Sequence, residues 1–155
     1  MNDTAITAQP GTPFIDVVRE FDAPRERVFR AWTDPQIVPQ WLGPCGLTMK
    51  EFEYDARPGG SYHYVHADER GEYAFRGVFH NVVPDELIIQ TFEYEGAPNQ
   101  VSLQAARFDD LGGGRTRLHM HSVYTTVESR DAMVASGMEH GVRDSMQRLD
   151  ELLAR

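Results

Sequence analysis

The pattern of apolar and polar positions divides the chain into a strand-rich middle between two helical regions. Residues 14–21 are rich in β-branched and aromatic side chains, which predicts a first strand. After residue 47, clusters of glycine, proline, acidic and amide residues recur at short intervals and mark turns. They separate six segments that predict antiparallel strands, at residues 48–54, 61–67, 73–82, 87–94, 101–108 and 115–125.

Alternation within these segments predicts a sheet with one packed face. In the last expected strand, Leu118 and Met120 share one face, whereas Arg117, His119 and His121 share the other. We therefore expect the first of these faces to be buried and the second to be hydrated.

Two short helices are predicted between the first and second strands. Pro24 suits the first turn of a helix, where its missing N–H is not needed, and Val28 and Trp32 then share one helical face. Residues 33–35, Thr-Asp-Pro, repeat the same start signal. The second helix should end at Gly-Pro, residues 43–44.

After Glu128 the apolar period becomes that of a helix, and we expect one long C-terminal helix of roughly 25 residues. Its apolar stripe consists of Val134, Met138, Val142, Ser145, Leu149 and Leu152. Gly137 and Gly141 interrupt it, although glycine inside a helix costs roughly 0.5–1 kcal/mol relative to alanine.

These two glycines predict either close packing of another backbone or open space beside the helix. The facing strands carry large rings at alternating positions, such as Tyr62, Tyr64 and Phe75, which favours open space. The alternative, that the glycines only permit tight helix-to-sheet packing, stays open.

Length and charge limit the possible function. The 155 residues fit one domain, expected over residues 14–155 after a flexible leader over residues 1–13. A formal net charge of −9 disfavours nucleic acid and anionic membranes as partners. One cysteine, Cys45, excludes an internal disulfide, the first residues lack a signal peptide, and no apolar run approaches the ~20 residues that span a bilayer. We expect a cytoplasmic protein without membrane insertion.

Several motifs together resemble the START-like helix-grip superfamily, also called SRPBCC. They are FDAPRERVFRAWTDP (residues 21–35), WLGP (41–44), DARPGG (55–60), GMEHG (137–141) and SMQRL (145–149). Within that superfamily they are most similar to the branch named after the activator of heat-shock-protein ATPase. The resemblance covers residues 14–153.

This resemblance implies an α+β helix-grip fold. In it, a seven-stranded curved antiparallel sheet wraps around the long C-terminal helix over a hydrophobic cavity, with two short helices between strands 1 and 2. Leu42 and Val142 stand where many relatives have tryptophan, and the smaller side chains imply more open volume.

Candidate ligand-binding residues follow from the expected inward faces of the sheet and of the last helix. We expect a chiefly apolar wall with His66 and Ser145 as polar points, although His66 could equally be a rim histidine that is hydrogen-bonded to water. The full candidate set is Tyr62, Tyr64, His66, Phe75, Phe79, Leu118, Met120, Met138, Val142 and Ser145.

No residue set predicts catalysis, a cofactor or a metal site. The six histidines lack a third ligand at recognisable spacing, and the serines lack a nucleophile elbow or an obvious base. Cys45 lies in a loop after the end of a predicted helix, and we expect it to be an inert thiol. The glycines at residues 112–114 join two strands and precede no helix, so they predict a hairpin rather than a phosphate loop.

The sequence therefore predicts a protein that binds a small hydrophobic or aromatic molecule between the sheet and the last helix, without catalysis. One alternative is an enzyme like the polyketide cyclases and dehydratases, in which His66 or a tyrosine moves a proton. Another is a co-regulator of a chaperone ATPase, as the family name suggests. A homodimer is compatible with each of these.

Overall fold

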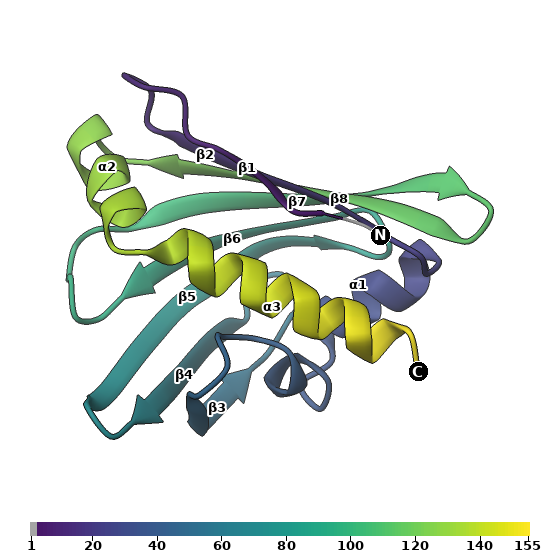
Figure 1. Ribbon diagram of the computed structural model, residues 1–155, viewed down its shortest axis with the longest axis horizontal. Helices are drawn as coiled ribbons and strands as arrows, with labels where there is room; N and C mark the ends of the chain where they lie inside the picture. Colours follow the sequence, from purple (N-terminus) through teal and green to yellow (C-terminus); the bar gives the residue numbers. More distant parts are fainter. Residues whose placement is uncertain (1–2) are drawn as a thin grey trace.

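One curved antiparallel sheet is the framework of the protein (Figure 1). Within residues 3–155, the part of the chain that this computed structural model describes, eight strands follow the order β1-β2-β8-β7-β6-β5-β4-β3. They are β1 (Ala5–Thr7), β2 (Phe14–Phe21), β3 (Thr48–Tyr54), β4 (Ser61–Asp68), β5 (Gly71–Val83), β6 (Leu87–Tyr94), β7 (Ser102–Gly112) and β8 (Arg115–Tyr124). Register shifts between Met49 and Glu51 and between Phe79 and Asn81 mark bulges, which bend strands and increase their twist.

The eighth strand comes from the segment that was expected to be a flexible leader. β1 pairs with β2, with Ile6 opposite Val17, and Arg19 Nη1 donates a hydrogen bond to Thr4 Oγ1 at 2.9 Å. The prediction of a flexible leader is therefore wrong for β1, because pairing along a sheet edge satisfies backbone groups that composition alone leaves unassigned. Residues 1 and 2 lie outside the described residues.

The first predicted helix is confirmed as α1 (Arg25–Thr33), which buries Val28 and Trp32. The second is only a single 3₁₀ turn, η1 (Val38–Gln40). Trp41, directly after η1, donates a hydrogen bond from Nε1 to the Ala31 carbonyl at 2.9 Å. This bond holds the 41–46 loop (residues 41–46) against α1.

The predicted single C-terminal helix is two helices, α2 (Val127–Ala135) and α3 (Met138–Leu153). Gly137 separates them with a φ of +86°, a left-handed conformation that ends α2 and that L-residues adopt only with strain. α2 lies at one end of the sheet, so α3 alone crosses the concave face (Figure 1). No helix among residues 3–155 is long and apolar enough to cross a membrane.

A large cluster of buried residues lies between α1, the concave face and the C-terminal half of α3. Leu149 and Leu118 are fully buried there, and Trp32 packs its ring against Trp41 and Phe108 at centroid distances of 4.5 and 5.7 Å. This cluster fixes α3 on the sheet at its C-terminal end.

Candidate functional site

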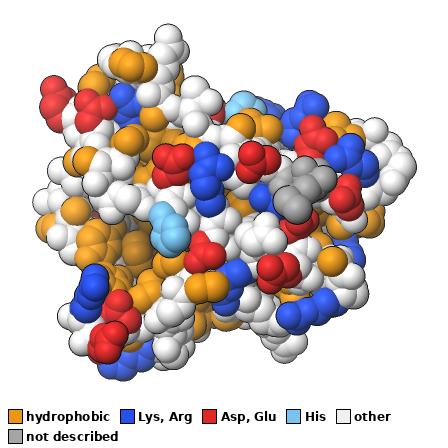
Figure 2. Space-filling model, in the orientation of Figure 1, with side chains coloured by type: hydrophobic (Ala, Val, Ile, Leu, Met, Phe, Trp, Pro, Cys, Tyr) orange, Lys and Arg blue, Asp and Glu red, His pale blue; other side chains and the backbone are white. Residues whose placement is uncertain are grey.

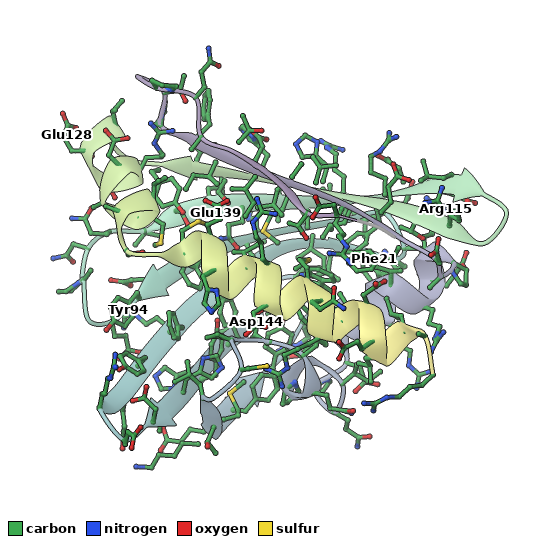
Figure 3. All side chains as sticks on the ribbon, in the orientation of Figure 1. Phe21, Tyr94, Arg115, Glu128, Glu139 and Asp144 are labelled. Carbon is green, nitrogen blue, oxygen red and sulfur yellow. The ribbon has the colours of Figure 1, made fainter. Side chains whose placement is uncertain are left out.

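A hollow lies beside the N-terminal half of α3, over strands β4–β6, and apolar side chains surround it (Figure 2). We call it the helix groove and define it by Gly141 and Val142 of α3 and by Phe75, Phe92 and Tyr94 of β5 and β6. All five residues are only partly buried. Figure 3 shows Tyr94 on this side of α3, at the end of the sheet opposite Phe21.

Stacked rings form the wall of the helix groove on the sheet side. The Phe75 ring lies 5.1 Å from that of Tyr64, 5.5 Å from Phe92 and 5.2 Å from Tyr94, measured between centroids. The register places these rings on adjacent strands of one face, with Tyr64 opposite Phe75 and Phe75 opposite Tyr94. Rings that pack against one another while staying partly exposed offer a flat apolar surface to a second ring.

Hydrogen bonds fasten α3 along both flanks and leave the groove between them. On one flank, Gly43 N–H donates to Ser145 Oγ at 2.9 Å, and Arg148 Nη1 donates to the Gly43 carbonyl at 2.8 Å. On the other flank, Arg143 donates to the Thr4 carbonyl, and Asp150 pairs with Arg19 at 3.1 Å. The helix is therefore held by the 41–46 loop and by the N-terminal edge of the sheet.

Gly141 lies on the Ser145 side of α3, one turn closer to the N-terminus, where the 41–46 loop no longer covers the helix. A Cβ built on Gly141 would meet no atom within 4 Å outside its own stretch of helix. Of the two sequence interpretations of this glycine, the structure therefore agrees with open space. Gly137, by contrast, marks the break between helices rather than space beside one.

His66 is buried where β4 meets the 41–46 loop. It is 5% exposed, its ring lies 5.2 Å from the Tyr64 ring, and a Cβ on Gly43 would come within 2.3 Å of its Cε1. Burial lowers the pKa of His66, and the positive charge of Arg148 lowers it further, so the ring is neutral at pH 7. Its side chain makes no hydrogen bond to the described residues.

Burial raises the pKa of Tyr62 and of Tyr64, so both hydroxyls stay protonated and neutral. The Tyr62 hydroxyl donates to the Thr91 carbonyl at 2.5 Å and is also hydrogen-bonded to the side chain of Gln90. The aromatic part of the site thus carries no charge near neutral pH.

The floor of the concave face holds polar residues that sequence reasoning missed. Gln90, Gln104 and Ser122 lie side by side on β6, β7 and β8, and Ser102 lies beside Tyr124 in the next row. The side chains of Gln104 and Ser122 make no hydrogen bond to the described residues. The sequence did contain a signal for them. Strict alternation through residues 102–108 places Ser102 and Gln104 on the same face as Ala106 and Phe108, which are buried.

The ten predicted binding residues all lie on the concave face or on α3, but they differ in exposure. Tyr62, Tyr64, Phe79 and Leu118 are at most 6% exposed and belong to the packed core. Phe75, Met120, Met138 and Val142 are half-buried. His66 and Ser145 are buried, and Ser145 is engaged with the 41–46 loop. Their role in binding stays a prediction.

Two recesses elsewhere have defined volumes. One of about 220 Å³ lies near the start of α1, lined by Arg25, Glu86 and Arg107 among others. A second, of about 390 Å³, lies between α2 and the turn at Gly11. Neither is lined by a predicted binding residue, so neither is the cavity that the sequence predicts.

The histidines expected on the polar face lie there. His119 Nε2 and His121 Nδ1 both contact Asp16 Oδ1, at 2.9 and 2.7 Å, on the convex side of the sheet. Burial alone would raise the pKa of Asp16, but the hydrogen bonds from His121 and His119 and their charges outweigh it and lower that pKa. Residues 3–155 contain no group of three or more histidine, cysteine or acidic residues arranged to hold a metal ion.

Comparison with known proteins agrees with this architecture. Residues 22–154 match the family described as Activator of Hsp90 ATPase homolog 1-like protein. A crystal structure of a protein from Rhodobacter sphaeroides has 28% sequence identity and a TM-score of 0.88, over 98% of this chain and 99% of that one. One from Chromobacterium violaceum has 28% identity and a TM-score of 0.81, over 92% and 98%. No curated protein matches the chain.

A protein from Silicibacter pomeroyi that carries the same family name shares the fold, at 22% identity and a TM-score of 0.76 over 91% of this chain and 97% of that one. These likenesses confirm the predicted α+β helix-grip fold, with one strand more than expected. The fold and the matched family are those of a ligand-binding domain.

Proposed function

Because the chain belongs to the family of Activator of Hsp90 ATPase homolog 1-like proteins, we propose that it binds a small hydrophobic or aromatic molecule in the helix groove. One observation carries the proposal: Phe75, Phe92 and Tyr94 stay partly exposed opposite a helix position, Gly141, that has open space beside it. A flat apolar ligand placed there would cover these rings and gain the free energy of their burial.

The geometry also indicates how such a ligand would be held. The aromatic wall supplies offset stacking, and Val142 supplies an aliphatic contact from the helix side. Because the C-terminal half of α3 is anchored in the core, binding need not order the helix as a whole. A preformed wall lowers the entropic cost of binding.

A thermal-shift screen of fatty acids, flavonoids and polyketide-like aromatics tests the proposal. A ligand at a hundred times its Kd adds ~2.7 kcal/mol to the free energy of unfolding, so a true ligand raises the Tm measurably. We expect aromatic compounds to give the largest shifts.

Two matched variants locate the effect. Gly141→Phe fills the helix groove and should abolish the shift, whereas Val134→Phe, at a residue of α2 that is 41% exposed, should leave it intact. The proposal fails if no compound shifts the Tm, or if both variants retain the same affinity as the parent protein.

The two alternatives from the sequence stay predictions. An enzyme of the cyclase or dehydratase type would show turnover that is lost in His66→Ala, and a chaperone co-regulator would stimulate a chaperone ATPase. Assays of the purified protein for turnover and for stimulation of a chaperone ATPase distinguish these two alternatives from ligand binding without catalysis.

A further inference from the structure

The floor of the helix groove contains polar side chains to which the described residues give no hydrogen bond of normal geometry, and one of them, Ser102, has a fully buried oxygen. Ser102 is 1% exposed, and its Oγ has no hydrogen-bond partner of normal geometry among the described residues, although the Tyr124 hydroxyl is its neighbour. Ser122 is 6% exposed, and the half-buried amide of Gln104 lies opposite it on the neighbouring strand. Neither side chain is hydrogen-bonded to the described residues.

Folded proteins rarely leave such groups unpaired. A buried donor or acceptor without a partner loses its hydrogen bonds to water, and no bond within the protein offsets that cost in free energy. Apart from the Tyr124 hydroxyl beside Ser102, the described residues offer these three side chains no partner, so water or a ligand supplies one.

The three side chains are close enough to act on one small molecule. Gln104 and Ser122 are direct neighbours across β7 and β8, and Ser102 is two residues from Gln104 on the same strand and face. Neighbouring strands lie ≈ 4.8 Å apart and same-face residues of one strand ≈ 7 Å apart, which is the scale of a fused ring system with its substituents.

The subsite also lacks charge. All three side chains are neutral, and the α3 charges on the groove side are already engaged: Asp144 accepts from Cys45 N–H and Arg148 donates to the carbonyls of Gly43 and Gln40. An ionised group brought to this floor would lose water without gaining a counter-charge. A hydroxyl or carbonyl group would be satisfied by the amide and the hydroxyls that are present.

We propose that Ser102, Gln104 and Ser122 form an uncharged hydrogen-bonding subsite on the floor of the helix groove, which selects aromatic ligands that carry a hydroxyl or carbonyl group. Hydrocarbons of the same ring size bind more weakly because they leave the three side chains unpaired. Carboxylates bind more weakly because their charge is not compensated. This inference rests on the proposed function of the groove and adds the class of ligand that the groove prefers.

Three probes with one ring system test the subsite: naphthalene, naphthol and naphthoate, measured by equilibrium dialysis at pH 7.5. We expect naphthol to bind about tenfold more tightly than naphthalene, as one or two hydrogen bonds would give, and naphthoate to bind most weakly. In Gln104→Leu this preference for naphthol should fall below about twofold while naphthalene binds as before. The control Gln147→Leu, an amide on the exposed side of α3, should keep the preference.

A second measurement does not depend on ligand. Ser102→Ala removes a buried hydroxyl that has no hydrogen bond of normal geometry, so the ligand-free variant should have a Tm that is higher by about 2–4 °C, while its affinity for naphthol falls. A group kept only for packing or for strand pairing would not stabilise the protein on removal.

The outcomes separate the two proposals. If naphthalene and naphthol bind equally, if naphthoate binds most tightly, or if Gln104→Leu keeps the preference, the subsite is refuted and the groove survives as an unselective apolar site. If none of the probes binds, both the groove and its subsite are refuted.

Discussion

The two halves of α3 face the same sheet but bury very different surfaces. In the C-terminal half, Met146, Leu149 and Leu153 are at most 6% exposed, whereas Met138 and Val142 in the N-terminal half are only partly buried. In Figure 3, Phe21 lies near the C-terminal half of α3 and Tyr94 beside the N-terminal half.

The difference comes from what lies beside each half. α1 and the 41–46 loop add Trp32 and Trp41 to the C-terminal half, and these rings close the space between helix and sheet. Beneath the N-terminal half the floor carries small or polar residues, Ser102, Gln104 and Ser122. One helix is thus tightly packed at one end and leaves partly exposed side chains at the other, a division that the proposed ligand site requires.

Truncation of a side chain in each half gives the largest expected contrast. Leu149→Ala, at a fully buried position, should lower the free energy of unfolding by about 2–5 kcal/mol through lost burial and the cavity left behind. Val142→Ala should cost about 1 kcal/mol or less, because its side chain is already partly exposed. Urea denaturation measures both, and similar costs would show that the N-terminal half is packed after all.

One substitution at the two α3 glycines should have opposite signs. Gly137→Ala places a Cβ at a φ of +86° and should cost about 1–2 kcal/mol. Gly141→Ala removes glycine from a helix interior where the Cβ has space, and should stabilise the protein by roughly 0.5–1 kcal/mol. Thermal denaturation of the two variants is sufficient, and a destabilising Gly141→Ala would mean that the space beside it is occupied.

A third test of the comparison between the two halves of α3 uses the pH dependence of stability. His66 lies where β4 meets the 41–46 loop, next to the open N-terminal half. Because burial and Arg148 lower its folded pKa, the unfolded chain takes up the proton first as pH falls through about 6.5. The contribution of His66 to the free energy of unfolding should therefore be constant above that pH and should decrease below it. In His66→Gln the decrease between pH 6.5 and 5 should be smaller, which denaturation at pH 7.5, 6 and 5 measures; an equal decrease would place the cause elsewhere.

Asp16 on the convex face provides a reference far from α3, and we expect the smallest effect there. Its folded pKa is lowered by His121 and His119 despite partial burial, so its contribution to stability is present above its ordinary pKa of 3.8 and is lost as pH falls through the lower folded value. Asp16→Asn should be slightly less stable than the parent at pH 7, and the gap should close below about pH 4. A gap that stayed unchanged as pH falls from 4 to 2 would contradict this assignment.

Much of the fold follows from local pattern. The bounds predicted for three strands, residues 14–21, 48–54 and 87–94, agree with β2, β3 and β6. Leu118 is buried and Arg117 exposed, as their alternation predicts. β1 was missed because three residues in a polar segment carry no alternation, and only the edge of β2 makes them a strand.

The candidate site was predictable in part. Its aromatic wall was expected, since Tyr64 and Phe75 lie on inward positions of neighbouring strands. The expected wall residues Phe79 and Leu118 instead fill the core, because α1 lies over their end of the sheet. Phe92 and Gln104 were missed, because their importance depends on which strands adjoin them.

By itself the sequence determined where strands and helices form and which side of each strand is apolar, because periods of two and of 3.6 residues depend only on neighbouring side chains. Only the tertiary structure decided that α3 is packed at one end and open at the other, because this depends on where α1 and the 41–46 loop dock. It likewise decided that Ser102, Gln104 and Ser122 lie together on one face of the sheet, since the register of separate strands, and not the order of residues within one, sets which polar groups can meet.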